Sequence, residues 1–169
     1  MFISEKLLLG EYYYPLAIQH NPKFESLILS QQKVNHISRC HAQMTERNME
    51  SDELRHLVSW IVNITHDNMV KPYEYISSSY NLQCHINWGI ICNQGDNLEE
   101  HRHNPAQFSF VYYVKCPEGS SPLVFTTSGY EVKAKAGKLV VFDSGLLHKV
   151  PQNNCNDRYS FVGNLSAVR

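Results

Sequence analysis

Several features that would define a partner or a compartment are missing from this sequence. Its 169 residues carry 15 lysines and arginines against 16 aspartates and glutamates, a formal net charge of −1, so the basic excess typical of nucleic-acid binding is absent. There is no long apolar run and no basic leader before a small-residue cleavage site, and we expect neither a membrane span nor a signal peptide. No repeat or low-complexity linker divides the chain, so we predict a single domain over residues 1–169.

Cysteine pairing patterns are also missing. The five cysteines form no CxxC motif and are widely spaced: Cys40, Cys84, Cys92, Cys116 and Cys155. An odd number at such spacings argues against a disulfide framework and against a thiolate zinc site. It favours reduced thiols in a cytoplasm (that of the host if the gene belongs to a phage), where most of them would be small buried hydrophobes.

The sequence that is present changes character near residue 80. Before this point the clearest periodic element is "SDELRHLVSWIVNITHD", residues 51–67, with an apolar stripe at helical spacing and Ser51 or Asp52 as N-cap. A second, weaker helix is predicted over residues 23–32. After residue 80, six short β-type runs are separated by turn residues: 84–93, 107–115, 122–127, 130–135, 138–143 and 158–166.

Many short strands at this spacing are typical of a sandwich or barrel. Several of the runs are apolar at nearly every position, as expected of strands that are buried on both faces. We therefore predict a mainly β protein with N-terminal helices, namely a double-stranded β-helix, the jelly roll of cupin-like proteins. Residues 81–169 would form its core, and residues 1–80 would be a helical preface packed on the barrel.

A histidine pair marks the candidate site. His101 and His103 are one residue apart, and in an extended strand both side chains would point the same way and could converge on one ion. The next histidine downstream is His148, and Arg158 follows ten residues later. Three imidazoles can hold a divalent first-row metal, and a guanidinium beside them is suited to bind a carboxylate. Each residue alone is as readily a loop, turn or surface residue, but their order and spacing together favour a site.

These residues resemble the 2-oxoglutarate- and Fe(II)-dependent oxygenases, in which two strands carry a His-x-Asp/Glu pair and a distal histidine, followed about ten residues later by an arginine. "HRHNPAQFSFVYYV" and "HKVPQNNCNDRYSF" are similar to the two halves of the site in the prolyl-hydroxylase-like branch, and to its bacterial and phage-type members with an HxH first motif. The resemblance covers about residues 84–165.

The resemblance implies roles for particular residues. Fe(II) would be bound by His101, His103 and His148, and the far carboxylate of 2-oxoglutarate by Arg158, Tyr113 and Ser160. Trp88 and Phe142 are candidates for the pocket wall. Asp143 is a candidate hydrogen-bond acceptor for an imidazole or an ordinary strand-end residue.

His103 departs from the family pattern, because it stands where a carboxylate ligand is expected. Three alternatives remain open. We favour a three-histidine site; a two-histidine site with water as the third ligand comes next. In the third alternative Glu99, two residues before His101, supplies the anion.

The activity that the resemblance implies is that of a dioxygenase using O2 and 2-oxoglutarate. It would hydroxylate an amino-acid side chain on a peptide, protein or small molecule and release succinate and CO2. One alternative is a cupin-type three-histidine metalloenzyme that acts on a small molecule without 2-oxoglutarate; another is a barrel that binds a ligand without catalysis. Arg158 argues against the cupin-type enzyme, in which it has no assigned task. The intact set of His101, His148 and Arg158 argues against a barrel without catalysis.

Overall fold

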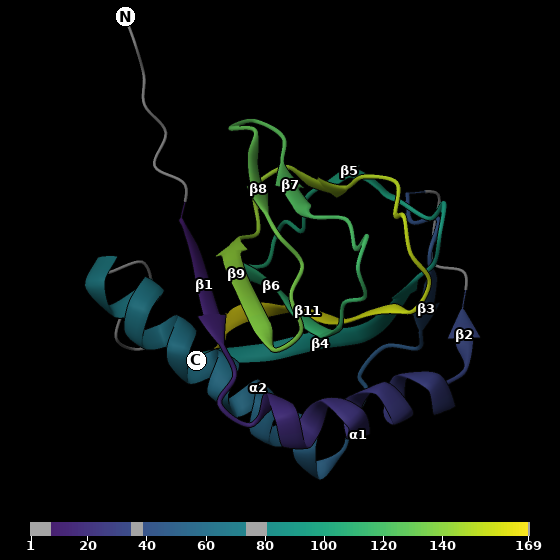
Figure 1. Ribbon diagram of the computed structural model, residues 1–169. Coiled ribbons are helices and arrows are strands. Elements are labelled where there is room, and N and C mark those ends of the chain that lie inside the picture. Colours follow the sequence, from purple (N-terminus) through teal and green to yellow (C-terminus); the bar gives the residue numbers. More distant parts are fainter. Residues whose placement is uncertain (1–7, 35–38, 74–80, 169) are drawn as a thin grey trace, which may run out of the picture.

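Two antiparallel sheets face each other and form the body of the protein (Figure 1). The computed structural model describes residues 8–34, 39–73 and 81–168. Within these residues the larger sheet has seven strands in the order β1-β9-β6-β11-β4-β3-β2, and the smaller has four in the order β5-β10-β7-β8. The prediction of a mainly β jelly roll is confirmed.

The predicted β-type runs all correspond to strands. Each of the six overlaps one strand of the structure, namely β4, β6, β7, β8, β9 or β11. The larger sheet consists of β1 (Leu9–Tyr13), β2 (Lys33–Val34), β3 (Gln43–Thr45), β4 (Asn81–Cys92), β6 (Phe108–Lys115), β9 (Lys138–Asp143) and β11 (Arg158–Val168). The smaller sheet consists of β5 (Leu98–His101), β7 (Leu123–Phe125), β8 (Tyr130–Val132) and β10 (His148–Val150).

Side chains of the larger sheet alternate between its two faces, as the pleat of a strand requires. On β11, Tyr159 and Phe161 belong to the apolar cluster on one face. Arg158, Ser160 and Val162 line a cavity on the other face, which is turned toward the smaller sheet. One strand therefore supplies both core and pocket.

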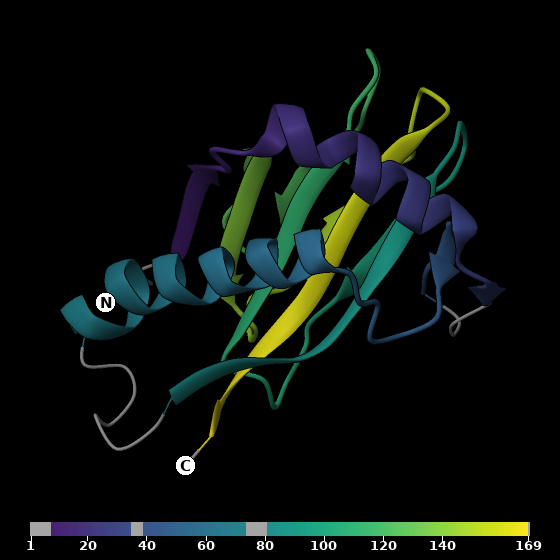
Figure 2. The same cartoon turned by 90° about the horizontal axis from the view of Figure 1, so that it is seen from below.

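Two helices, α1 (Ala17–Ser30) and α2 (Asp52–Thr65), lie across the outer face of the larger sheet (Figure 2). The predicted cap of α2 is confirmed at Ser51, whose Oγ accepts a hydrogen bond from the Leu54 N–H at 3.1 Å. After α2 the chain continues through a π-helical turn at His66–Val70 and a 3-10 turn at Lys71–Tyr73.

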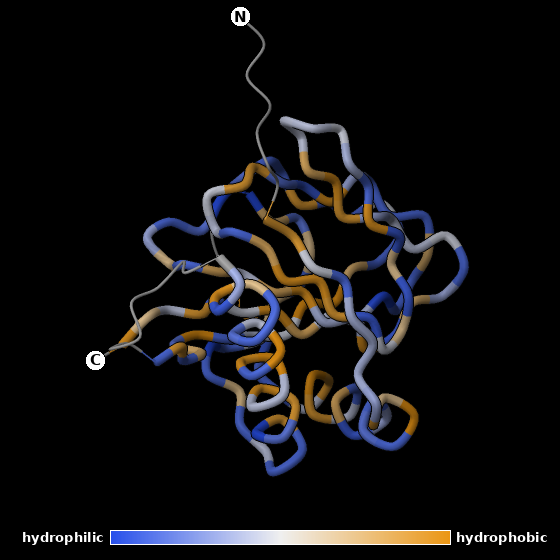
Figure 3. Tube along the Cα trace, turned by 90° about the vertical axis from the view of Figure 1, so that its left-hand side faces the viewer, coloured by the Kyte–Doolittle hydropathy of each residue, from blue (hydrophilic) through white to orange (hydrophobic). Residues whose placement is uncertain are grey.

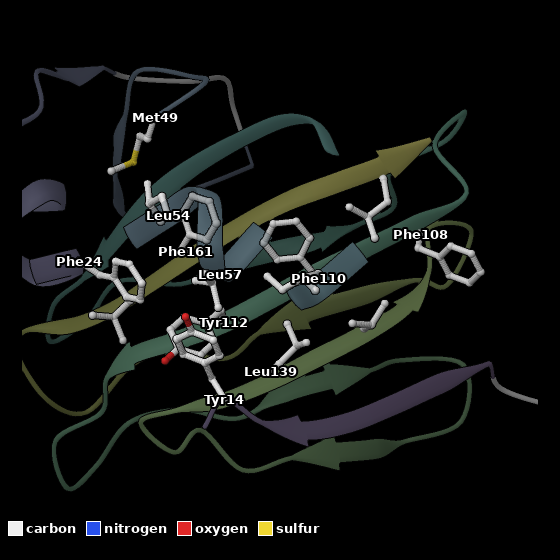
Figure 4. Close-up of a cluster of buried hydrophobic side chains, with 14 of the residues drawn as sticks. Tyr14, Phe24, Met49, Leu54, Leu57, Phe108, Phe110, Tyr112, Leu139 and Phe161 are labelled. Carbon is white, nitrogen blue, oxygen red and sulfur yellow. The ribbon is translucent and has the colours of Figure 1, made fainter. Parts of the chain in front are cut away.

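The core lies between these helices and the sheet (Figure 4). Leu57 of α2 is fully buried in the same cluster as Phe110 and Phe161, whose ring centroids are 5.6 Å apart. Burying one side chain of this size stabilises the fold by roughly 1.5–3 kcal/mol. Hydrophobic stretches accordingly follow the strands, while the peripheral loops are mainly hydrophilic (Figure 3).

The prediction of a helical preface over residues 1–80 missed strands that belong to the larger sheet. β1, β2 and β3 all precede residue 80. β2 and β3 have two and three residues, too few to show an alternating pattern, and β1 is an edge strand with little burial. Because these strands join the sheet formed by residues 81–168, they support the single-domain organisation, which stays a prediction.

Helix α1 also begins earlier than predicted. It starts at Ala17, six residues before the predicted start at residue 23. Leu16 provides no side-chain cap, and Pro22 lies inside the helix. Both features hide a helix start from sequence patterns, since a polar cap is the usual signal and proline usually marks a boundary.

The cysteines and helices bear on two other expectations. The five cysteines are free thiols, and Cys92 is buried while the others are half-buried, so fewer of them are core residues than expected. No helix in the described part of the chain combines the length and apolar character needed to cross a bilayer.

Candidate metal centre

Three histidines converge at one end of the smaller sheet. Strands β5 and β10 are antiparallel neighbours, and their register sets His101 directly opposite His148, with ring centroids 4.4 Å apart. His103 joins them from the turn after β5, where its N–H donates to the Ser144 carbonyl at 2.8 Å. One nitrogen of each ring lies within 4.8 Å of one nitrogen of the others. The predicted convergence is found, but His103 lies beyond the strand rather than on it.

Backbone carbonyls fix the tautomers of two rings. The Nδ1 of His101 lies 2.7 Å from the Glu99 carbonyl oxygen, and the Nδ1 of His148 lies 2.8 Å from the Leu146 carbonyl oxygen. A carbonyl can only accept, so each Nδ1 carries the proton and donates it. The lone pair is therefore on Nε2, the atom left free to bind a metal.

Burial keeps all three imidazoles neutral at physiological pH. Desolvation, followed by the field of His101, lowers the pKa of His103 to about 4 and that of His148 to about 3. Desolvation also lowers the pKa of His101, despite the opposing hydrogen bond to the Glu99 carbonyl. Neutral imidazole is the form that coordinates metal ions, so this cluster is ready to bind one without first losing protons.

Glu99, the alternative third ligand, is engaged elsewhere. Its carboxylate pairs with His41 Nε2 at 3.0 Å, on the exposed surface. The group of candidate ligands within reach of one ion, among the described residues, is His101, His103 and His148. The geometry thus favours the three-histidine alternative over the one that requires Glu99.

Arg158 and Tyr113 form a second polar group on the larger sheet. Arg158 begins β11 and is 2% exposed, and its Cζ lies 5.2 Å from the centroid of the Tyr113 ring. Ser160 is directly opposite Tyr113 across β11 and β6, and its Oγ accepts a hydrogen bond of 3.4 Å from Arg158 Nη1. The three residues predicted to act together are therefore neighbours.

This second group has unused hydrogen-bonding capacity. The Tyr113 hydroxyl and the Arg158 Nε are buried and have no hydrogen-bond partner among the described residues. Burial raises the pKa of Tyr113 to about 12, although the Arg158 guanidinium opposes the shift, so the hydroxyl keeps its proton and can donate it. Arg158 forms no ion pair with a described carboxylate.

A cavity of about 390 Å³ connects the histidines with part of the second group, since His101, His103 and His148 line it together with Arg158 and Ser160. The predicted residue Tyr113 is not among the lining residues and lies behind them, against the Arg158 guanidinium. The predicted wall residues Trp88 and Phe142 also line it, and the Phe142 ring packs edge-on against His148 with centroids 4.7 Å apart. Asp143 accepts a hydrogen bond from the Gly145 N–H at 2.8 Å, which fits its reading as a strand-end residue.

Sequence patterns missed part of the cavity lining. Arg39 and Arg47 come from the segment before residue 80, and Arg102 stands between the paired histidines. Arg39 and Arg47 belong to no recognisable motif, and Arg102 is the variable position of the HxH motif. Only the three-dimensional arrangement therefore reveals that the three arginines share one cavity.

No protein-family model matches the chain, and no curated protein sequence matches it. Solved structures do match. A prolyl-4-hydroxylase from Pseudomonas putida is 14% identical, with a TM-score of 0.73 over 95% of this chain and 92% of that chain. The viral collagen prolyl hydroxylase of Paramecium Bursaria Chlorella virus-1, in complex with 2-oxoglutarate, is 13% identical, with a TM-score of 0.66 over 95% and 97%.

A third similar structure is not named as a prolyl hydroxylase. HygX from Streptomyces hygroscopicus, with nickel and 2-oxoglutarate bound, is 11% identical, with a TM-score of 0.62 over 94% of this chain and 83% of that chain. The protein thus has the jelly-roll fold of 2-oxoglutarate–Fe(II) oxygenases, and prolyl-4-hydroxylases are among the similar structures. At these identities the likeness is one of fold, and function has to be argued from the site.

Proposed function

We propose that the protein is an Fe(II)- and 2-oxoglutarate-dependent oxygenase. The observation that carries the proposal is a buried arginine without a counter-ion, Arg158, in the same cavity as three converging histidines. The shared fold with structures that contain 2-oxoglutarate supports it.

The donor set fits the metal. His101, His103 and His148 would hold Fe(II) through ring nitrogens, a ligand type that suits divalent first-row metals. Two of the rings are fixed in the tautomer that presents Nε2. No carboxylate belongs to the cluster, so in this proposal a neutral imidazole, His103, replaces the anionic ligand of the usual triad.

The second group fits the co-substrate. A buried, unpaired guanidinium is costly, by several kcal/mol per ion, and a carboxylate from 2-oxoglutarate would remove that cost by pairing with Arg158. The Tyr113 hydroxyl supplies a further donor with no other partner, and Ser160 orients the guanidinium. Hydrogen bonds to a charged group contribute about 1.5–3 kcal/mol each.

Iron and 2-oxoglutarate, when bound, would use O2 to insert one oxygen atom into a C–H bond, while the other oxygen atom enters succinate as 2-oxoglutarate loses CO2. The chain supplies binding, orientation and exclusion of water. Apolar side chains, among them Ile86, Ile90 and Val162, also line the cavity and would help to exclude water from it. We propose hydroxylation of an amino-acid side chain on a peptide, protein or small molecule; the names of the prolyl hydroxylases among the similar structures support this.

The test is anaerobic addition of Fe(II) and 2-oxoglutarate, with the visible metal-to-ligand charge-transfer band as readout. Wild type should develop the band, and His148→Ala should not. Arg158→Met should weaken 2-oxoglutarate about 100-fold because it removes one partner of a buried charge pair, while Arg55→Met, exposed on α2, should bind as wild type does.

Failure of wild type to develop the band would overturn the proposal. The alternative of a three-histidine metalloenzyme that works without 2-oxoglutarate would then remain. If Arg158→Met developed the band at the same 2-oxoglutarate concentrations as wild type, Arg158 would not be the residue that binds the far carboxylate of 2-oxoglutarate. His103→Ala separates the remaining ligand alternatives: weaker iron binding supports the three-histidine site, and unchanged binding favours water as third ligand.

A further inference from the structure

We propose that the substrate oxidised by this protein is an anion, a compound with an apolar body and a carboxylate or phosphate group that Arg39, Arg47 and Arg102 bind at the mouth of the cavity. This inference rests on the proposed function, since it concerns the compound that the oxygenase would act on. It names a chemical class for that substrate.

The three arginines come from separate segments and line one cavity. Arg39 lies next to Cys40, which bridges to Leu98 of β5. Arg47 follows β3, and Arg102 follows β5. All three side chains are exposed and line the same cavity as the histidines. We call them the arginine rim.

The rim arginines have no task within the described structure. No ion pair and no side-chain hydrogen bond joins Arg39, Arg47 or Arg102 to another described residue, whereas Arg55 on α2 pairs with Asp52. Exposed arginines with free guanidinium groups, grouped around a cavity, are suited to bind carboxylate or phosphate in a bidentate manner.

Charge is unevenly distributed over the chain. Acidic residues slightly outnumber basic ones, 16 to 15, yet the charged side chains that line the cavity are all arginines, and no aspartate or glutamate lines it. Since His103 stands where a carboxylate is usual, the ligand cluster adds no negative charge either. Arg158 is assigned to the co-substrate, so the positive charge of the rim is left for a second anion. A cleft of one sign focuses its field and attracts the opposite charge.

Trp88 provides an independent observation from the same cavity. Its ring lines the cavity 6.3 Å from the His103 ring, measured between centroids. Its Nε1 is buried and has no hydrogen-bond partner among the described residues, although a buried indole N–H normally has one. An oxygen of a ligand beside the histidines would satisfy it.

The apolar residues that line the cavity indicate the chemistry of the uncharged part of the substrate. Met44, Ile90 and Leu98 are apolar and come from the strands that carry or border the rim. Together with the rim they favour a compound with an apolar part beside the histidines and an anionic group toward solvent. The competing explanation is that the rim attracts 2-oxoglutarate, itself a dianion, and the experiment must separate the two.

The experiment compares three probes of similar size: benzoate, phenyl phosphate and neutral benzyl alcohol. Each is titrated by ligand-observed NMR into the protein loaded with Zn(II) and N-oxalylglycine, an unreactive analogue of 2-oxoglutarate. At least one anion should bind at least tenfold more tightly than benzyl alcohol, and the preferred anion identifies carboxylate or phosphate as the group. In the triple variant Arg39→Gln, Arg47→Gln, Arg102→Gln the preference should fall below about threefold.

The triple variant should still develop the anaerobic charge-transfer band, and its N-oxalylglycine affinity should stay within about threefold of wild type, because Arg158 is intact and only the longer-range field of the rim is lost. Arg55→Gln is the matched control and should keep the anion preference. Equal binding of charged and neutral probes, or no binding of either anion, would overturn the inference. So would a triple variant that keeps the anion preference, whether or not its N-oxalylglycine affinity falls. Absence of the band in wild type would instead refute the proposed function, so the two failures are distinguishable.

Discussion

The larger sheet presents one face to the helices and the other to the smaller sheet, and two adjacent tyrosines of β6 illustrate the difference. Tyr112 faces the helices, and its hydroxyl donates to Asn21 Oδ1 at 2.5 Å. Tyr113 points to the opposite side, toward the smaller sheet, and its equally buried hydroxyl has no partner among the described residues. The Tyr112 hydroxyl is thus satisfied within the chain, while the Tyr113 hydroxyl, next to Arg158, keeps a donor available to a ligand. Such local departures from the rule of satisfied polar groups are expected at functional sites.

The largest difference between the faces should be in stability. Phe161→Ala empties a fully buried site on the helix face and should lower the free energy of unfolding by about 3–5 kcal/mol. Val162→Ala, the next residue on β11, borders the cavity and should lower it by less than half as much, because fewer atoms are removed and the space next to the side chain is already hollow. Urea denaturation of both variants measures this. Equal losses would show that the two faces stabilise the fold alike.

Acid should destabilise the metal-free protein through the cavity face. The folded-state pKa is about 4 for His103 and about 3 for His148, both below the value of about 6.5 for a free imidazole. The unfolded chain therefore takes up protons first as the pH falls, so stability present above pH 6.5 is lost toward pH 4 and below. The loss between pH 7.5 and 5.5 should be about 2.7 kcal/mol for the two groups.

Urea midpoints at several pH values, with chelator present, measure that loss. His148→Gln should make the pH dependence shallower, since it removes one of the titrating groups. A slope that stays the same in this variant would place the acid sensitivity elsewhere in the molecule.

The smallest effect should come from the paired tyrosines. Tyr113→Phe removes a hydroxyl without a partner, so the ligand-free protein should keep its stability or gain up to about 1 kcal/mol, while 2-oxoglutarate binding weakens severalfold. Tyr112→Phe removes the hydrogen bond to Asn21 and should cost about 1 kcal/mol without affecting 2-oxoglutarate. Thermal unfolding and 2-oxoglutarate titration compare them. If Tyr113→Phe were the more destabilising variant, its hydroxyl would have a structural role.

Sequence patterns predicted the parts of the fold that have strong local signals. The strands β6, β9 and β11 are long, apolar runs that are buried on both faces, and α2 has both a cap and an apolar stripe. β5 and β10 have four and three residues and were not predicted, because pairing with neighbours rather than composition makes them strands. The same holds for β2 and β3.

The residues of the site also divide into those with a local sequence signal and those without one. His101, His148 and Arg158 were predicted because their spacing is readable along the chain, and the structure brings them to one cavity. Arg39 and Arg47 were missed because they reach the cavity only through the pairing of β3 with β4 and the bridge at Cys40. Contacts between residues so distant in sequence leave no local pattern.

The hydrogen bonds that orient the two opposing histidines have a consequence for how this protein tolerates mutation. His101 and His148 each donate to a main-chain oxygen two positions back, at Glu99 and Leu146. Every amino acid carries that oxygen, so substitutions at positions 99 and 146 leave the acceptor in place as long as the backbone keeps its path. The orientation of these two rings therefore does not depend on which side chains occupy positions 99 and 146. The side chains around the site can change, and with them the substrate that fits, while the rings keep their orientation.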